Sequence, residues 1–161
     1  MRTILAVMML ASGFQGQTTP ARPDFNGHWV VFATTDTSPS VVREFDIAFN
    51  RDKGTLTVTR RMRGLPRTET YTMGTVNGPT VMGDRGPVTK TRRYLGWDGP
   101  GLVVGEYSSL HRDADSGHEE YWTIDAQGRL KVETTVWSPG NAATTNSVIY
   151  IKQKISHSAG R

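Results

Sequence analysis

The chain has 161 residues, enough for one domain and too few for two ordinary ones. Hydrophobic residues make up 36% and charged residues 21% of the sequence, so a single modest core is expected. Cysteine is absent, which excludes disulfides, zinc sites built on thiolates and thiol catalysis.

The formal net charge is +4, and the charges are unevenly distributed along the chain. Residues 51–93 hold ten Lys or Arg against three Asp or Glu, whereas residues 98–125 hold one Arg against seven Asp or Glu. Two complementary faces of one fold are the simplest interpretation. Nucleic-acid binding is the alternative, but no basic helix is evident and the aromatic residues are not interleaved with the basic run. No nucleic-acid partner is therefore expected.

The first residues have the pattern of a secretory signal peptide. Arg2 precedes an apolar run over residues 4–11, and Ala11-Ser12-Gly13 supplies the small residues of a cleavage site. The run is shorter than the roughly 20 residues that span a bilayer, so no transmembrane segment is expected in the mature chain. A disordered start or an N-terminal strand is the alternative. We predict a signal peptide over residues 1–16, a linker over residues 17–23, and a periplasmic or secreted protein.

After the linker, the sequence is typical of short strands separated by turns. Apolar side chains alternate with polar ones, and Gly, Pro, Asn and Asp are concentrated between the alternating segments. No segment shows sustained helical periodicity. The sequence predicts ten strands, over residues 27–34, 41–49, 55–62, 67–73, 76–83, 88–97, 102–110, 118–125, 129–137 and 147–154.

Short links between successive strands favour a single all-β domain over residues 24–154, with a flexible tail over residues 155–161. We predict an antiparallel up-and-down β-barrel of about eight to ten strands, because closure removes exposed strand edges. An immunoglobulin-type sandwich is the alternative, but its Cys-Trp-Cys pattern is missing.

The triplet Gly27-His28-Trp29 resembles the Gly-x-Trp signature of lipocalins and fatty-acid-binding proteins, the calycin group. The resemblance implies that Trp29 closes one end of the barrel and that a late basic residue, here Lys152, packs over it. More of the chain is similar to the lipocalin-like domains of uncharacterised exported bacterial proteins. That resemblance covers residues 23–154 and implies a fold rather than an activity. Its segments are PDFNGHW at 23–29, Leu-Thr-Val at 56–58, WDGPGLVV at 97–104, EEYWTIDAQGRLKVE at 119–133 and VIYIKQK at 148–154.

The interior of such a barrel is the expected binding site. If Trp29 faces inward, a period of two also directs inward the apolar residues Phe45, Ile47, Leu56, Val58, Tyr71, Trp122, Ile124, Leu130, Val132 and Tyr150. The same faces carry Arg43, Arg60 and Glu120. We predict that the barrel binds a small hydrophobic or anionic amphipathic molecule. The predicted ligand-binding residues are Arg43, Phe45, Arg60, Tyr71, Glu120, Trp122 and Tyr150.

The alternative is that the arginines pair with Glu106 or Glu120 and merely fill the interior. Binding of an anion therefore requires at least one internal arginine without an internal acid partner. A filled interior with a large exposed apolar patch outside would instead indicate a structural or protein-interaction module of the cell envelope.

Motifs for catalysis and for metal binding are weak or missing. Gly-x-Ser-x-Gly and a phosphate-binding loop are both absent, so a small barrel enzyme acting on a lipid-like substrate is the least favoured function. We predict no catalytic residue and no cofactor. The segment 111–120 is rich in His and Asp, but its spacing departs from a calcium loop and suits a solvated turn, so no metal site is predicted. The sequence leaves the oligomeric state open.

Overall fold

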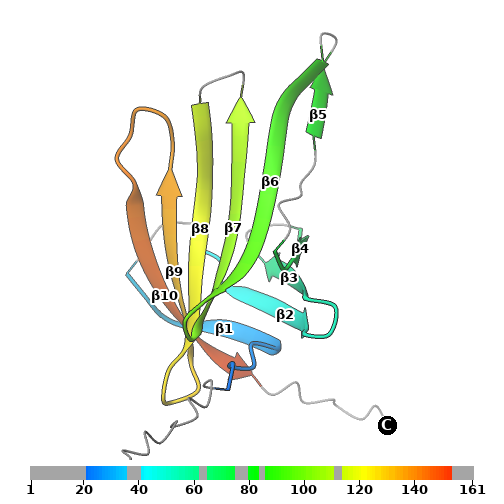
Figure 1. Cartoon of the computed structure of the whole chain (residues 1–161). Coiled ribbons are helices and arrows are strands. Elements are labelled where there is room, and N and C mark those ends of the chain that lie inside the picture. Colours follow the sequence, from blue (N-terminus) through cyan, green and yellow to red (C-terminus); the bar gives the residue numbers. More distant parts are fainter. Residues whose placement is uncertain are drawn as a thin grey trace, which may run out of the picture.

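The computed structural model describes residues 21–35, 41–61, 65–74, 80–83, 86–110 and 114–153, which contain ten strands and no helix (Figure 1). The prediction of an all-β fold is confirmed. The predicted signal peptide and the predicted tail lie outside the described residues. The strands are β1 (Gly27–Thr34), β2 (Glu44–Asn50), β3 (Thr55–Arg61), β4 (Arg67–Thr72), β5 (Thr80–Gly83), β6 (Gly86–Asp98), β7 (Gly101–Leu110), β8 (Ala114–Ile124), β9 (Leu130–Trp137) and β10 (Thr144–Gln153).

All ten strands belong to one sheet, in the order β4-β3-β2-β1-β10-β9-β8-β7-β6-β5. The pairs are antiparallel and join neighbours in sequence, and β1 pairs with β10 to unite the two halves. The sheet curls until the end of β4 meets β6. There Met73 and Leu95 form a parallel bridge, and the Gly74 N–H donates to the Leu95 carbonyl at 3.2 Å. The result is the predicted up-and-down barrel, nearly closed.

β2, β8 and β10 begin several residues away from their predicted starts. β2 starts at Glu44 and so is shorter than predicted at its beginning, whereas β8 and β10 start earlier than predicted, at Ala114 and Thr144. Backbone pairing with β7 and β9 extends these two strands through polar residues typical of turns. The loop predicted over residues 138–146 is correspondingly shorter.

The wall of the barrel has two heights (Figure 1). β6, β7, β8 and β10 have 13, 10, 11 and 10 residues, whereas β2, β3 and β4 have 7, 7 and 6. The long strands rise side by side beyond the short ones. We call the end where they project the open end, and the end that holds residues 21–26 the closed end.

One apolar core runs through the barrel, and its largest fully buried side chains include Trp29, Trp122 and Phe45. The Phe45 ring lies 4.4 Å from that of Tyr150 and 5.9 Å from that of Trp122, measured between ring centres. Of the apolar residues predicted to face inward, Ile124 is partly buried and all the others are buried. A period of two therefore predicted the core correctly.

The segment before β1 seals the closed end. Phe25 is fully buried, and its carbonyl accepts a hydrogen bond from the Trp29 indole nitrogen at 2.9 Å. Arg51 donates to the carbonyls of Arg22 and Pro23, both at 2.8 Å. The last residues of the predicted linker are thus fastened to the barrel through their backbone.

Gly27 and Lys152 determine the geometry around Trp29. Gly27 has a φ of 132°, a backbone angle that residues other than glycine rarely adopt. A Cβ at this position would also collide with the stem of Lys152. Lys152 is the register partner of Trp29, and its Nζ lies 5.5 Å from the centre of the Trp29 ring. Glycine in this triplet therefore leaves space for a cation to lie over the tryptophan.

Candidate functional site

Six of the seven predicted ligand-binding residues are buried in the barrel: Phe45, Arg60, Tyr71, Glu120, Trp122 and Tyr150. The prediction that Arg43 faces the interior is wrong, because this residue is exposed. β2 begins only at Glu44, so the alternation that buries Phe45 does not extend back to Arg43. The Arg43 carbonyl accepts a hydrogen bond from the Val31 N–H at 2.9 Å.

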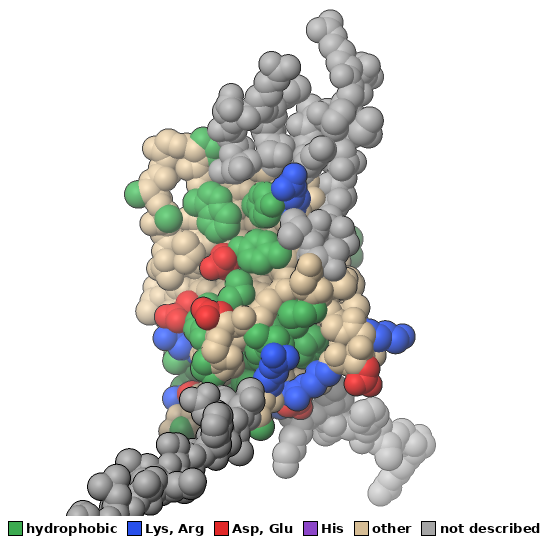
Figure 2. Space-filling view, in the orientation of Figure 1, with side chains coloured by type: hydrophobic (Ala, Val, Ile, Leu, Met, Phe, Trp, Pro, Cys, Tyr) green, Lys and Arg blue, Asp and Glu red, His purple; other side chains and the backbone are tan. Residues whose placement is uncertain are grey.

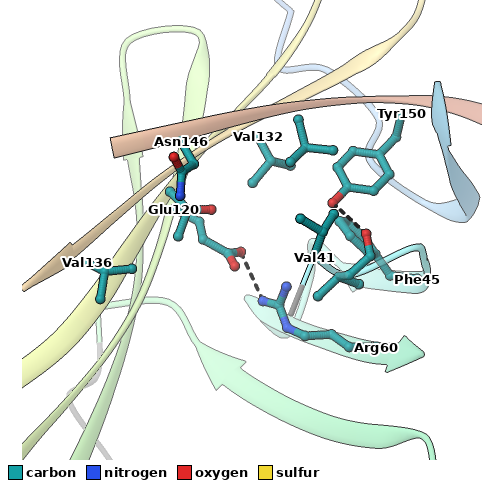
Figure 3. Close-up of a pocket in the computed structure, with 11 residues that line it drawn as sticks. Val41, Phe45, Arg60, Glu120, Val132, Val136, Asn146 and Tyr150 are labelled. Carbon is teal, nitrogen blue, oxygen red and sulfur yellow. Dashed lines mark hydrogen bonds and ion pairs between the residues drawn. The ribbon is translucent and has the colours of Figure 1, made fainter. Parts of the chain in front are cut away.

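A cavity of about 250 Å³ lies at the open end (Figure 3). Its walls are mainly apolar, and Arg60 and Glu120 meet on one side of it in an ion pair of 2.9 Å. Pockets for drug-sized ligands typically measure about 300–1,000 Å³, so this cavity suits a smaller molecule. It is lined by Val41, Val42, Phe45, Arg60, Glu120, Val132, Thr134, Val136, Asn146, Val148 and Tyr150.

Two predicted site residues, Tyr71 and Trp122, do not line this cavity. They donate hydrogen bonds to the buried carboxylates of Glu69 and Glu120. The Trp122 indole nitrogen donates to Glu120 Oε2 at 2.8 Å, and the Tyr71 hydroxyl donates to Glu69 Oε2 at 3.1 Å. Both rings are buried beside the carboxylates that they contact. They position the polar wall of the cavity.

A second cavity of about 160 Å³ borders the same ion pair. It shares Val42, Arg60 and Glu120 with the first cavity and adds side chains of β4 and β8. Its lining consists of Val42, Arg60, Arg67, Glu69, His118 and Glu120. The Arg60–Glu120 pair therefore faces open space on two sides.

Arg60 is held between two buried carboxylates. Its Nε donates to Glu69 Oε2 at 3.0 Å, and its Nη2 donates to Glu120 Oε2 at 2.9 Å. Arg60, Glu69 and Glu120 are 7%, 3% and 6% exposed. On the sequence alone, binding of an anion is conditional on an internal arginine that has no internal acid partner. Arg60 does not meet this condition, and Arg43 is not internal.

Glu69 is a residue that the sequence reasoning missed. It stands two positions before Tyr71 in β4, and both side chains are buried on the inner face. The same period of two that placed Tyr71 inside also applies to Glu69. The alternation therefore also predicts an inward carboxylate at Glu69, which could pair with the inward Arg60.

Further ion pairs lead from the cavity to the seam between β4 and β6. Arg67 lies 2.9 Å from Glu69 and 3.4 Å from Glu106, and Arg93 lies 2.6 Å from Glu106. Within the described residues, the Met73–Leu95 bridge is the single backbone bridge between the end of β4 and β6. Ion pairs between side chains therefore supply much of the contact at this seam. We call the whole series the ion-pair chain; its members, in order, are Arg93, Glu106, Arg67, Glu69, Arg60 and Glu120.

The ion-pair chain shifts the ionisation of its members. Burial lowers the pKa of Arg60, but Glu120, Tyr71 and Glu69 together outweigh it, so this pKa lies above its ordinary value. Burial raises the pKa of Glu69, but Arg60 and Arg67 outweigh it and hold this pKa below its ordinary value. For Tyr150, burial and then Glu120 raise the pKa of the phenol. Arg60 and Glu69 are therefore charged at neutral pH, and Tyr150 is neutral.

The described part of the chain contains neither a metal-binding cluster nor a membrane-spanning helix. There, no group of three or more His, Asp or Glu side chains is arranged to hold a metal ion. Residues 111–113 of the segment rich in His and Asp lie outside the described residues. Within the described ranges, no helix has the length and hydrophobicity to cross a membrane.

The fold and the site together define a small antiparallel β-barrel with one closed end and an apolar cavity that contains a buried ion pair. Neither a family model nor a curated protein matches the chain. Among solved structures, it is similar to secretory abundant heat soluble protein 4 from Ramazzottius varieornatus. The two are 14% identical, the match covers 80% of this chain and 94% of that one, and the TM-score is 0.48. At this level of similarity, function does not transfer from one protein to the other.

Proposed function

We propose that the protein is a non-catalytic binding barrel that holds a small hydrophobic or amphipathic molecule in the cavity at its open end. The main support is the cavity of about 250 Å³, in which one ion pair interrupts largely apolar walls. Apolar walls with a few convergent polar groups are typical of ligand sites. An anionic ligand is no longer favoured, because Arg60 already pairs with Glu69 and Glu120.

Native mass spectrometry of the protein, purified gently from its own host, tests this proposal. An additional mass that is lost on denaturation, and that organic extraction identifies as a small apolar or amphipathic compound, is the expected result. A bare protein mass, together with no thermal stabilisation by any compound in a panel of lipids, alcohols and amides, would contradict it.

Two adjacent residues of β10 offer a matched pair of variants. Val148 lines the cavity, whereas Ile149, next to it, does not and points to the opposite side of the sheet. Val148→Phe is expected to fill the cavity and to reduce ligand affinity at least about tenfold, because overlapping volume must be displaced. Ile149→Phe should leave affinity unchanged. Equal affinities for both variants would place the ligand elsewhere.

We also propose that the protein is exported, on the evidence of the apolar run over residues 4–11 and the small residues that follow. Cell fractionation combined with intact mass measurement tests this. The expected result is a periplasmic or secreted protein that lacks its first residues. A full-length protein found only in the cytoplasm would contradict export.

A second candidate function, a protein-interaction module of the envelope, has support on the outer surface. Hydrophobic side chains gather over β7 and β8 on the face seen in Figure 2. The Tyr94 and Tyr121 rings lie directly over Gly105 and Gly101, where a Cβ would overlap them. The outward aromatic residues of β6–β9 are Tyr94, Tyr107, Tyr121 and Trp137. Loss of an envelope partner in Tyr107→Ser, with cavity binding intact, would favour this function.

A further inference from the structure

The ion pair leaves one carboxylate oxygen available to the cavity. Glu120 Oε2 accepts from both Arg60 Nη2 and Trp122 Nε1, at 2.9 and 2.8 Å. Glu120 Oε1 has no hydrogen-bond partner among the described residues, in contrast to Glu69, which uses both oxygens. Every fully buried side-chain polar atom of the described residues has a partner, so Oε1 must lie open to the cavities that Glu120 lines.

Arg60 contributes unused donors at the same place. A guanidinium carries five N–H groups, and Arg60 uses Nε and Nη2 for Glu69 and Glu120. The Tyr71 phenol also interacts with the guanidinium, and the two ion-pair hydrogen bonds leave Nη1 unused, while Arg60 lines both cavities. The polar wall therefore offers a hydrogen-bond acceptor on Glu120 and a hydrogen-bond donor on Arg60, both lining the same cavities.

The charges of this wall are already paired, which disfavours a second ion. Arg60 and Glu120 pair with each other, and Arg67 and Arg60 both pair with Glu69, so the wall has no unpaired charge to offer a ligand. An incoming carboxylate would lose its hydration and meet two carboxylates whose arginine is already shared. An ammonium would approach Arg60 and would have no lone pair to accept from Nη1. A neutral group that both donates and accepts avoids both penalties.

We propose, building on the proposed function, that the occupant of the cavity is an uncharged amphiphile whose polar end is a hydroxyl or carboxamide group. This group donates to Glu120 Oε1 and accepts from Arg60 Nη1. The apolar part of the molecule lies along Val132, Val148 and the other aliphatic side chains of the wall.

Four compounds with the same alkyl chain length test the proposal on the unmodified protein: 1-decanol, decanamide, decanoate and decylamine. Their dissociation constants can be measured by displacement of an apolar fluorescent probe at neutral pH. The alcohol and the amide are expected to bind at least about tenfold more tightly than the carboxylate, because a carboxylate would lose its hydration without gaining an unpaired cation. The amine is expected to bind more weakly than the alcohol as well.

The outcomes separate this inference from the proposed function. Decanoate or decylamine binding as tightly as decanol would overturn the inference and leave the binding function intact. Failure of all four to displace the probe would overturn both.

Glu120→Gln adds an independent comparison, with Glu119→Gln as its control because Glu119 is exposed on the same strand. Removal of the Glu120 charge is expected to reduce the preference for decanol over decanoate, whereas the control should retain it. An unchanged preference in a folded Glu120→Gln variant would also overturn the inference. If that variant does not fold, the series on the unmodified protein decides.

Discussion

The two ends of the barrel are held together by different forces. At the closed end, Phe25 and Trp29 are buried against the core, and Lys152 covers the indole. At the open end, Arg60, Glu69 and Glu120 are buried charges, and ion pairs through the exposed Arg67 connect them to Glu106 and Arg93. Apolar contacts are insensitive to pH, whereas ion pairs depend on the protonation of every member. The stability of the closed end therefore depends little on pH, whereas that of the open end depends on the ionisation of its paired side chains.

This difference has an energetic side. Burial of one large apolar side chain contributes about 1.5–3 kcal/mol, which makes the closed end a net source of stability. Buried ion pairs contribute little net stability, yet loss of one partner is costly because the remaining charge has no compensation. The ion-pair chain is therefore better explained by the cavity that it borders than by the stability of the fold.

Arg60→Met gives the largest expected effect, because it leaves Glu69 and Glu120 buried without their shared cation. We expect a loss of about 3–5 kcal/mol in the free energy of unfolding, measured by urea denaturation at neutral pH. The triple variant Arg60→Met, Glu69→Gln, Glu120→Gln removes the charges together and should recover a large part of this loss. A single variant as stable as the unmodified protein would mean that the buried charges do not depend on Arg60.

Gly27→Ala tests how much the contact between Lys152 and Trp29 stabilises the closed end. Alanine is strained at a φ of 132°, and its Cβ would displace Lys152 from Trp29. We expect a loss of about 1–3 kcal/mol of stability, with ligand affinity at the open end unchanged. Urea denaturation and the probe assay measure the two effects separately. A loss of affinity equal to the loss of stability would show that the two ends are coupled.

Acid should weaken the open end through Glu69. The pKa of Glu69 is lower in the folded protein than its usual value of about 4.5, so its stabilising contribution is complete above that value. It is lost as the pH falls towards the lowered pKa, at about 1.4 kcal/mol per unit of pKa difference. Urea midpoints between pH 7 and pH 3 should therefore decline at the acid end. Glu69→Gln should decline less, and an equal decline would assign the effect to other carboxylates.

The sequence predicted the barrel and much of its core from alternation and turns alone. Leu56, Val58 and Trp122 are buried as a period of two required, and the strands pair in chain order. These features depend on neighbours in sequence or on short links between strands. They can be predicted from sequence because side chains alternate between the two faces in every strand and because successive strands usually pair.

The predictions that failed depended on the point at which a strand begins or on contacts between distant residues. Arg43 precedes β2, which begins at Glu44 rather than at the predicted residue 41, and no feature of the composition marks this start. β8 begins at Ala114 because β7 pairs with it, although its first residues resemble a turn. The pairing of Arg60 with Glu120 was expected only as the alternative to anion binding, because alternation places both residues inside but does not show that residues 60 positions apart meet.

The smallest expected effect concerns Lys152, whose ammonium lies over Trp29 at the closed end. A planar guanidinium stacks on indole better than an ammonium does, so Lys152→Arg should add a few tenths of a kcal/mol, roughly 0.3–0.5. Lys152→Met keeps an apolar stem and removes the charge, which separates packing from the cation–π contact. We expect the order of stability Arg, Lys, Met in urea denaturation, with differences that decrease at high salt. If Met is as stable as Lys, the apolar stem of residue 152 accounts for its whole contribution, and the cation–π contact with Trp29 adds no measurable stability.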